Sequence, residues 1–202
     1  MDTAIDLQVY TVRQIEDLEL PYAIGGSMAA SAYGTPRFTR DVDIVVDLPL
    51  EKVSAFMARF PHADFYIDEV AIRQAVRERS QFNIIHHESG VKVDIYIPAE
   101  AIQQNQIKRA RRLVSESGEA NYSPPEELII MKLDYYQYGQ PQRHLEDIVS
   151  LLYGLRGNVD FEMIEREVAA RGLQEPWSAA KLRWKEVVDA KLAAAERERP
   201  AG

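Results

Sequence analysis

The feature that most constrains the fold is a β-branched run, residues 42–47, which follows directly on an acidic residue. Successive side chains of a strand point to opposite faces, so Asp41 and Asp43 share one face, roughly 6.6 Å apart along the strand. Val42 and Ile44 share the other face. Two acids on one side of a core strand are costly unless they are solvated, paired or bound to a metal. The run therefore predicts either a solvated strand end or a cation site.

A glycine-rich turn precedes this strand, and a third acid follows it. Gly25, Gly26 and Ser27 come after a short apolar segment, and such a turn offers backbone N–H groups to phosphate oxygens. Asp94 lies inside a second strand-like run, residues 91–97. Two carboxylates on one strand, joined by one from a neighbouring strand, can hold a pair of divalent metal ions. Such a metal pair can catalyse the transfer of a nucleotidyl group.

The composition indicates the broad class of the protein and the cellular compartment that it suits. The chain has 202 residues and is 46% apolar, which is normal for a globular protein with a core. It has no cysteine, which excludes disulfides, zinc–thiolate sites and thiol nucleophiles and fits a reducing compartment. Its start lacks the basic and apolar segments of a secretory signal, and no apolar run approaches the ~20 residues that span a bilayer. We expect a soluble, cytoplasmic protein without a membrane partner.

The charge is acidic overall and unevenly distributed. A net charge of −8 argues against a general nucleic-acid coat, because affinity for phosphate backbones comes from concentrated Lys and Arg. A local basic surface stays compatible with the sequence. The basic residues gather in three groups, which are Arg37 with Arg40, Arg73 with Arg77 and Arg79, and Lys108 with Arg109, Arg111 and Arg112.

Periodicity and turn signals divide the chain into a mixed core and a helical end. Strands are expected over 42–47, 65–67, 81–87 and 91–97, with a short apolar segment at 22–24 and a short extended piece at 113–114. Helices are expected over 6–19, 27–33, 50–60, 69–79, 98–112, 125–138, 141–154, 160–171 and 176–197. The turn between 81–87 and 91–97 requires an antiparallel hairpin, so the sheet is mixed. We therefore predict an α/β (α+β) core over residues 1–122 and a helical region over 123–202 packed on it.

These motifs resemble the nucleotidyltransferase superfamily that shares a palm-like fold with DNA polymerase beta. The superfamily pattern is a hydrophobic residue, Gly-Gly/Ser, a spacer, Asp-hydrophobic-Asp/Glu-hydrophobic, and a distant Asp on a later strand. The matching segments are Ile24-Gly25-Gly26-Ser27, Asp41-Val42-Asp43-Ile44 and Val93-Asp94-Ile95. The fuller stretch over 25–43, with 125–133 and 143–148, looks like the bacterial branch that contains toxin-type enzymes of abortive-infection systems. The resemblance spans about residues 20–155 and is more specific for the superfamily than for a substrate.

The resemblance implies roles for the three acids. Asp41 and Asp43 would coordinate Mg²⁺ or Mn²⁺, which grips the triphosphate of a nucleoside triphosphate. Asp94 would complete a second metal site and help to activate an acceptor hydroxyl.

The resemblance also implies a phosphate-binding set. The Gly25 and Gly26 amides and the Ser27 hydroxyl would hold phosphate oxygens. Lys132 would contact phosphate as a point charge. The contribution of the protein would then be positioning and charge neutralisation, as in other phosphoryl-type transfers.

Several further residues have more than one interpretation each. Asp147 would belong to the nucleotide site by the resemblance. It also lies four residues after Arg143, a spacing that suits a surface ion pair, and a contact between packed helices is a further alternative. Arg37 and Arg40 would neutralise phosphate or acceptor charge, or they belong to an ordinary solvated loop. The tyrosines of segment 135–138 would stack on a base or pack within a helical core.

The sequence therefore predicts a metal-dependent nucleotidyltransferase, which joins a nucleoside monophosphate to an acceptor and releases pyrophosphate. The acceptor stays open between RNA, a tRNA end in particular, a protein hydroxyl, and a small molecule such as an aminoglycoside or a lincosamide. An antitoxin-like protein is a candidate partner, and we expect a monomer or a homodimer. The alternative is a non-catalytic module that binds a nucleotide or a partner protein, although the intact trio Asp41, Asp43 and Asp94 argues against it.

Overall fold

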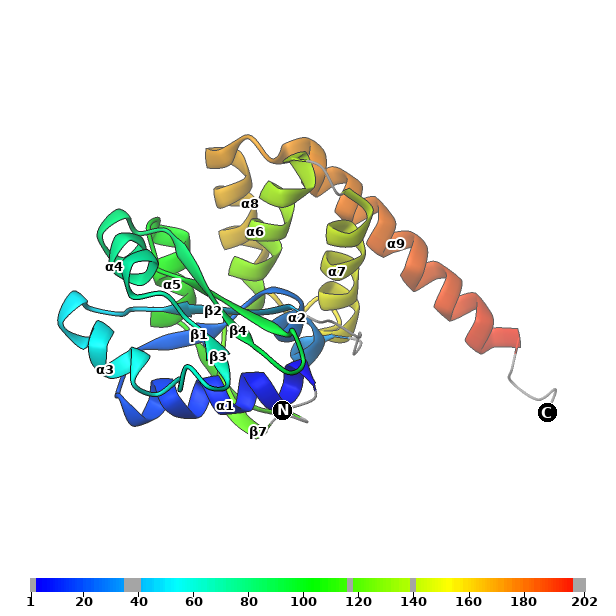
Figure 1. Ribbon diagram of the computed structural model, residues 1–202. Coiled ribbons are helices and arrows are strands. Elements are labelled where there is room, and N and C mark those ends of the chain that lie inside the picture. Colours follow the sequence, from blue (N-terminus) through cyan, green and yellow to red (C-terminus); the bar gives the residue numbers. More distant parts are fainter. Residues whose placement is uncertain (1–2, 35–40, 116–117, 139–140, 198–202) are drawn as a thin grey trace.

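The computed structural model describes residues 3–34, 41–115, 118–138 and 141–197, which form one seven-stranded sheet with helices on both faces (Figure 1). The strand order is β3-β4-β5-β2-β1-β7-β6. The strands are β1 (Tyr22–Ile24), β2 (Asp41–Val46), β3 (Phe65–Tyr66), β4 (Gln81–His86), β5 (Lys92–Tyr96), β6 (Arg111–Ser115) and β7 (Gly118–Tyr122). Central β2 pairs antiparallel with β1 and parallel with β5, while β4 and β5 form the antiparallel hairpin. The expected mixed sheet is confirmed.

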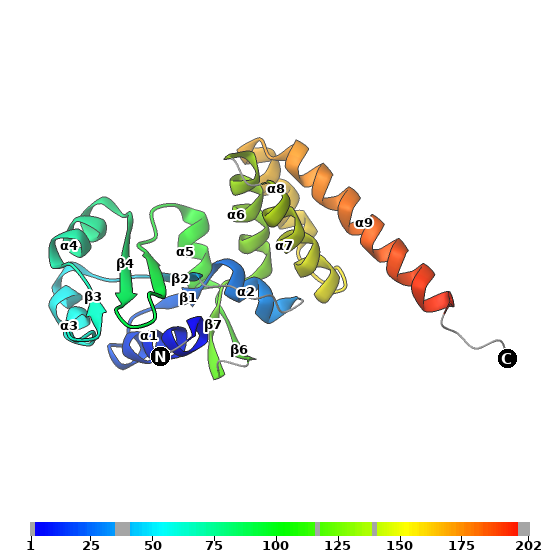
Figure 2. The same cartoon turned by 45° about the vertical axis from the view of Figure 1, so that its right-hand side comes forward.

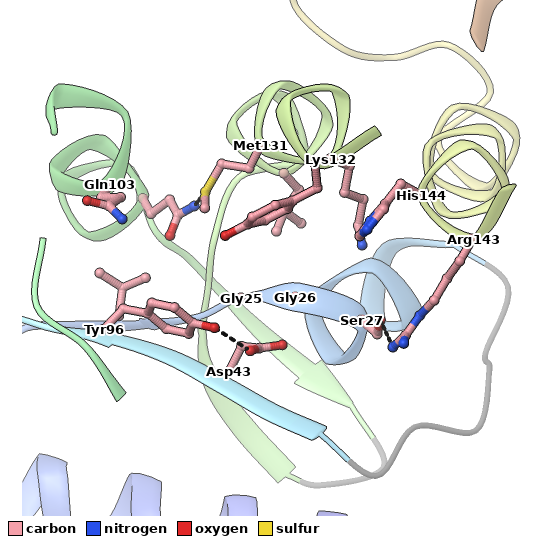
Figure 3. Close-up of a pocket in the computed structure, with 14 residues that line it drawn as sticks. Gly25, Gly26, Ser27, Asp43, Tyr96, Gln103, Met131, Lys132, Arg143 and His144 are labelled. Carbon is pink, nitrogen blue, oxygen red and sulfur yellow. Dashed lines mark hydrogen bonds between the residues drawn. The ribbon is translucent and has the colours of Figure 1, made fainter. Parts of the chain in front are cut away.

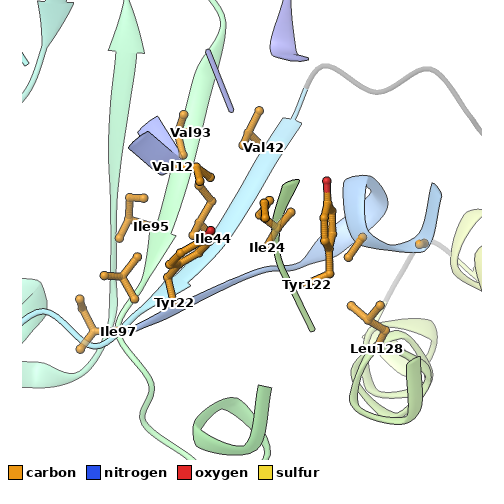
Figure 4. Close-up of a cluster of buried hydrophobic side chains, with 14 of the residues drawn as sticks. Val12, Tyr22, Ile24, Val42, Ile44, Val93, Ile95, Ile97, Tyr122 and Leu128 are labelled. Carbon is orange, nitrogen blue, oxygen red and sulfur yellow. The ribbon is translucent and has the colours of Figure 1, made fainter. Parts of the chain in front are cut away.

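Helix α1 (Ala4–Asp17) covers the apolar face of the sheet. A capping box closes its first turn, in which the Thr3 side chain accepts a hydrogen bond from the Asp6 amide and Asp6 accepts one from the Thr3 amide. Alternation in β2 and β5 sends every second side chain toward this face, where four of them are fully buried (Figure 4): Val42, Ile44, Val93 and Ile95. The same alternation places the acids of these strands on the opposite face.

The remaining helices of the core connect the strands. They are α2 (Gly26–Tyr33), α3 (Val53–Met57) after the 3₁₀ turn η1 (Leu50–Lys52), α4 (Glu69–Glu78) and α5 (Ala101–Lys108). The helix expected over 50–60 is thus shorter and begins as a 3₁₀ turn. Helices α2 and α5 both pack against β2, so they border the face of the sheet that carries the acids.

Helices are the only regular structure in the described part of the C-terminal region. They are α6 (Pro125–Tyr138), α7 (Pro141–Gly154), α8 (Phe161–Arg171) and α9 (Gln174–Arg197). Helix α6 contacts α2, α5 and α7, and α9 extends away from the rest of the molecule, as Figure 2 shows. Trp177 and Ala180 of α9 are buried, whereas Leu182 and Leu192 are exposed. Across the described ranges, none of the helices has the length and apolar character needed to cross a bilayer.

The segment before this region differs from the sequence-based expectation. The helix expected over 98–112 ends at Lys108, and a hairpin of β6 and β7 follows at the edge of the sheet. Gly118 begins β7 at φ 93°, a conformation that glycine adopts readily. The piece expected at 113–114 is the middle of β6. Because β6 is mostly exposed and begins with two arginines, it lacks the apolar alternation that identifies a strand.

Two glycines join α2 to α7 at backbone distance. Gly34 follows α2, and a Cβ atom there would lie 2.8 Å from the carbonyl oxygen of Ser150 in α7. A Cβ atom at Gly154 would lie 2.6 Å from both the Gly34 Cα atom and the Tyr33 carbonyl oxygen. Since packed backbone cannot move aside as the end of a side chain can, both positions require glycine. This contact fixes the C-terminal end of α2 on the helical region.

Replacing Gly154 with alanine is expected to lower the free energy of unfolding by about 1–3 kcal/mol, because overpacking against backbone outweighs the higher helix propensity of alanine. Urea unfolding followed by circular dichroism measures the difference. The control is Gly172→Ala, at φ 70° with no described atom within 4 Å of the added Cβ, which costs only backbone strain of about 1 kcal/mol. A Gly154→Ala protein as stable as the wild type would contradict the close contact.

Candidate functional site

A pocket of about 220 Å³ opens between the acidic face of the sheet and helices α2, α5, α6 and α7 (Figure 3). Asp43 lies near its middle, Tyr96 and Gln103 lie toward one end, and Ser27 and Arg143 lie toward the other. The other residues that line it are Gly25, Gly26, Val45, Gln106, Leu128, Met131, Lys132, Tyr135 and His144. The pocket therefore combines segments of the chain that are far apart in sequence.

The acids predicted from the sequence lie on one face of two neighbouring strands. In the parallel pair of β2 and β5, Asp43 is directly opposite Asp94, and Asp41 is directly opposite Lys92. Neighbouring strands lie about 4.8 Å apart, so the backbones of these two residues are separated by about this distance and their side chains leave the same face of the sheet. The structure thus brings Asp43 and Asp94 together, while the roles of the three acids stay predictions.

Asp94 is held by two neighbours. Asn83 of β4 donates a hydrogen bond of 2.5 Å to its Oδ1, and the Lys92 ammonium lies 2.8 Å from its Oδ2. The hydrogen bond to Asp94, with the negative charges of all three acids, raises the pKa of Lys92. Asp94 itself is only 7% exposed. Lys92 therefore supplies one positive charge to a face that carries three carboxylates.

Asp43 is disfavoured in its charged form. Burial raises the pKa of its carboxyl, and the nearby charges of Asp94 and Asp41 raise it further. A hydrogen bond of 3.3 Å from the Tyr96 hydroxyl to Oδ1 acts in the opposite direction. A further positive charge beside Asp43 would relieve the repulsion, which is the electrostatic requirement of a cation site.

The glycine turn lies directly against this carboxylate. The Gly25 amide donates a hydrogen bond of 2.8 Å to the Asp43 carbonyl oxygen. Gly26 has φ 55°, and a Cβ atom on it would lie 1.9 Å from Oδ2 of Asp43, so glycine is required there for both conformation and space. The N-terminus of α2 consequently forms the pocket wall beside Asp43, where backbone N–H groups favour anions such as phosphate.

A buried ion pair links α6 to α7 behind the turn. The Lys132 ammonium lies 2.6 Å from Oδ2 of Asp147, and each residue is 5% exposed. The same Asp147 oxygen accepts a hydrogen bond of 3.5 Å from the Ser27 hydroxyl. The interpretation of Asp147 as half of a surface ion pair is therefore wrong, because its carboxylate lies in the interior. Lys132, Asp147 and Ser27 form one polar network at the wall of the pocket.

Arg143 is a residue of the pocket that the sequence reasoning missed. Its guanidinium donates a hydrogen bond of 3.4 Å to the Ser27 hydroxyl (Figure 3). It also lies 3.8 Å from Oδ2 of Asp41. It thereby spans from the start of α2 to the start of β2. No local pattern indicates this contact, since 116 residues separate Arg143 from Ser27.

Tyrosines from two elements also line the pocket, one of which the sequence analysis did not single out. Tyr96 was missed, although it lies two residues after Asp94 and the period of a strand puts both on one face. Tyr135 lines the pocket, so it is available for contact with a bound molecule. Arg37 and Arg40, predicted to neutralise phosphate or acceptor charge, lie outside the described residues.

The acidic face suits a divalent cation by its chemistry. Carboxylate oxygens are the donors that Mg²⁺ and Mn²⁺ prefer, and burial, followed by the charges of Asp94 and Asp41, raises the pKa of the Asp43 carboxyl. In the described part of the chain, no three His, Asp or Glu side chains converge as a ready metal cluster. The neighbours of Asp94 and Asp43 engage their oxygens instead. The acids are therefore suitable donors by their chemistry, but among the described residues they do not form a ready metal site, and binding would require their side chains to move.

Comparison with known proteins finds similar solved structures but no similar sequence. No protein-family model matches the chain, and no curated protein matches its sequence. The solution structure of the antibiotic-resistance factor ANT(2'')-Ia matches with a TM-score of 0.54 and 16% identity, over 92% of this chain and 100% of that one. An antigenic nucleotidyltransferase-like protein from Paracoccidioides brasiliensis matches with a TM-score of 0.55 and 19% identity, over 90% of this chain and 93% of that one.

A third match is the crystal structure of ANT(2'')-Ia in complex with adenylyl-2''-tobramycin, with a TM-score of 0.51 and 16% identity, over 82% of this chain and 95% of that one. At such identities the likeness is one of fold. The chain has the mixed α/β fold of nucleotidyltransferase-like structures, as the sequence motifs implied. The narrower likeness to toxin-type enzymes stays a prediction.

Asp43→Asn is expected to stabilise the folded protein at neutral pH, by on the order of 1 kcal/mol, because it removes a half-buried charge that faces Asp94. The pKa of Asp43 is raised on folding, so the folded state keeps this proton to a higher pH than the unfolded state. The contribution of Asp43 to stability therefore falls as the pH rises from the usual carboxyl pKa to the raised one. Urea unfolding at about pH 4 and about pH 7 should show a larger gain at the higher pH.

The control for this comparison is Asp47→Asn. Asp47 follows the same strand and is exposed, so the substitution should change the free energy of unfolding by less than about 0.5 kcal/mol. An Asp43→Asn protein less stable than the wild type at neutral pH would contradict the repulsion described above.

Lys132→Met is expected to lower the free energy of unfolding by about 3 kcal/mol or more, because it removes the ammonium that balances the buried Asp147 carboxylate. The double variant Lys132→Met/Asp147→Leu should recover most of this loss, since no buried charge is then left unbalanced. Urea unfolding of the two single variants and the double variant gives the coupling energy. Losses that simply add in the double variant would show that the pair is not coupled.

Proposed function

We propose that the protein is a metal-dependent nucleotidyltransferase, which transfers a nucleoside monophosphate from a nucleoside triphosphate to an acceptor hydroxyl. The observation that supports this most is the register of Asp43 opposite Asp94 on parallel strands, with Gly26 packed against the Asp43 carboxylate. One surface thereby offers acidic ligands for a cation beside a helix N-terminus suited to phosphate.

The triphosphate would bind at the Ser27 end of the pocket. Backbone N–H groups at the start of α2 and the Ser27 hydroxyl would hold its oxygens. Arg143 already reaches both Ser27 and Asp41, so its guanidinium would turn to the phosphates with little movement. Lys132 lines the same end, and Asp147 would act indirectly by orienting Lys132 and Ser27.

The three acids would act at the reacting phosphorus. Asp41, Asp43 and Asp94 would hold Mg²⁺ or Mn²⁺, which when bound neutralises phosphate charge. The acceptor oxygen forms a new ester bond to the α-phosphorus, the bond from the α-phosphorus to the bridging oxygen breaks, and pyrophosphate leaves with the electron pair. Asp94 would take the hydroxyl proton and pass it to water.

The structural relatives support group transfer without settling the acceptor. The ANT(2'')-Ia crystal structure contains adenylyl-2''-tobramycin, so a protein of this fold binds a nucleotidylated small molecule. RNA, a protein and a small molecule all stay open as acceptors on this ground. A toxin role rests on the sequence resemblance, and it would require growth inhibition on expression that a protein from a neighbouring gene relieves.

A different observation favours a second candidate, a non-catalytic nucleotide- or partner-binding module. Asn83 and Lys92 engage both oxygens of Asp94, the acid that would activate the acceptor. If these contacts persist when a nucleotide binds, the protein would bind without turnover. The two functions differ in whether pyrophosphate is released.

Label transfer tests the proposal. The protein is incubated with each α-labelled ribonucleoside triphosphate, Mg²⁺ or Mn²⁺, and a cell extract. We expect label on one acceptor, with the rate lowered about 10²-fold or more in Asp43→Asn and about tenfold in Arg143→Ala. Asp47→Asn should retain the wild-type rate. Nucleotide binding with no label on any component would support the binding module instead.

A further inference from the structure

The two ends of the pocket differ in chemistry. Ser27, Lys132 and Arg143 give one end hydrogen-bond donors and two cationic side chains, each of which lies beside a carboxylate. The opposite end lies between β5, α5 and α6 and is lined by uncharged side chains, which are Tyr96, Gln103, Gln106, Met131 and Tyr135. The two ends of the pocket would therefore bind groups of different chemistry.

If the proposed function holds, the geometry of the reaction determines which end of the pocket receives the leaving pyrophosphate and which receives the acceptor. In phosphoryl-type transfer the attacking and leaving oxygens lie roughly in line on opposite sides of the phosphorus. Pyrophosphate leaves toward Ser27 and Arg143, and the reacting phosphorus lies beside Asp43 near the middle of the pocket. The acceptor hydroxyl therefore enters from the uncharged end, where Tyr96 and Gln103 lie.

Gln106 shows what kind of group this end receives. The residue is 1% exposed and lines the pocket, and its Oε1 atom has no hydrogen-bond partner among the described residues. Its Nε2 atom contacts Sδ of Met131. A buried acceptor atom left without a donor is destabilising, so such atoms are normally satisfied by a ligand or by water. An N–H or O–H group of a bound molecule would satisfy this one.

The surroundings of this end disfavour phosphate. A second cavity of about 290 Å³ shares Gln103, Met131 and Tyr135 with the first and is also lined by Glu100, Asp134 and Arg171. Arg171 lies within 3.4 Å of three carboxylates, those of Glu100, Asp134 and Glu167. Burial, and then the charges of Asp43, Asp134 and Glu100, raise the pKa of Tyr135. The two carboxylates of Glu100 and Asp134 thus outnumber the Arg171 guanidinium around this cavity, and their charge disfavours an anionic chain such as RNA.

We propose that the acceptor is a small alcohol without phosphate, neutral or cationic, that donates a hydrogen bond to Oε1 of Gln106. The cavity measures about 220 Å³ in all, and the phosphates would occupy its Ser27 end, so the space left at the uncharged end suits a compact molecule. Tyr96, Gln103 and Tyr135 supply further polar contacts around it. Gln106 is then a specificity-determining residue for the transfer reaction.

The experiment separates acceptors by size. A cell extract is divided by ultrafiltration, and the filtrate and the retained RNA and protein are each incubated with the protein, Mg²⁺ and α-labelled nucleotide. We expect a labelled product from the filtrate. Amino alcohols, amino sugars and neutral sugars then serve as defined acceptors, and the product is checked for phosphate other than the transferred group.

Variants test the role of Gln106. Gln106→Met keeps the length of the side chain and removes the carboxamide, so it should raise the acceptor KM about tenfold while nucleotide affinity is kept. Gln106→Glu keeps an oxygen atom that can accept the hydrogen bond, so the KM for the acceptor substrate should stay closer to the wild-type value. Gln104→Met is the matched control, because Gln104 lies on the same helix but lines a different cavity beside Asp47 and Arg79.

Each outcome decides a separate point. Label from the filtrate with a raised KM in Gln106→Met supports the inference. Label only on retained RNA or protein overturns it and leaves the proposed function standing, as does a labelled acceptor that carries its own phosphate. An unchanged acceptor KM in Gln106→Met overturns the assignment of this end. No label from either fraction overturns both the inference and the proposed function.

Discussion

The placement of two carboxylates side by side on parallel strands is the constraint on which the rest of the site depends. Asp43 and Asp94 face each other across β2 and β5, and burial makes their repulsion costly. Neighbouring groups reduce that cost: Tyr96 donates to Asp43, while Asn83 and Lys92 hold Asp94. The folded protein thus keeps a strained arrangement of charge at one place, which is common where a site must receive a cation.

Much of this arrangement could be predicted from the sequence because it depends on a short period. Alternation within a strand puts Asp41 and Asp43 on one face and sets Asp94 opposite the apolar Val93 and Ile95, so all three acids share a face once both strands turn their apolar side to the core. The same rule would have identified Tyr96. The glycine turn could also be predicted from the sequence. The structure gives the physical reason for glycine at position 26, which is a positive φ and no space for a side chain.

The rest could not be predicted because it depends on contacts between distant segments. Arg143 reaches Ser27 and Asp41 only after α7 has packed on α2, and no spacing along the chain encodes that. The partner of Asp147 is Lys132 on another helix, whereas local spacing suggested Arg143. The edge hairpin of β6 and β7 was missed for a different reason, namely that its exposed residues carry little apolar pattern.

Helix α2 acts as a spacer of fixed length. Its N-terminal end is set by Gly26 against the Asp43 carboxylate, and its C-terminal end by Gly34 against the backbone of α7. At eight residues it spans about 12 Å. Inserting one residue would shift one end by about 1.5 Å and rotate it by about 100° relative to the other. This helix should therefore tolerate changes of side chain far better than any change of length.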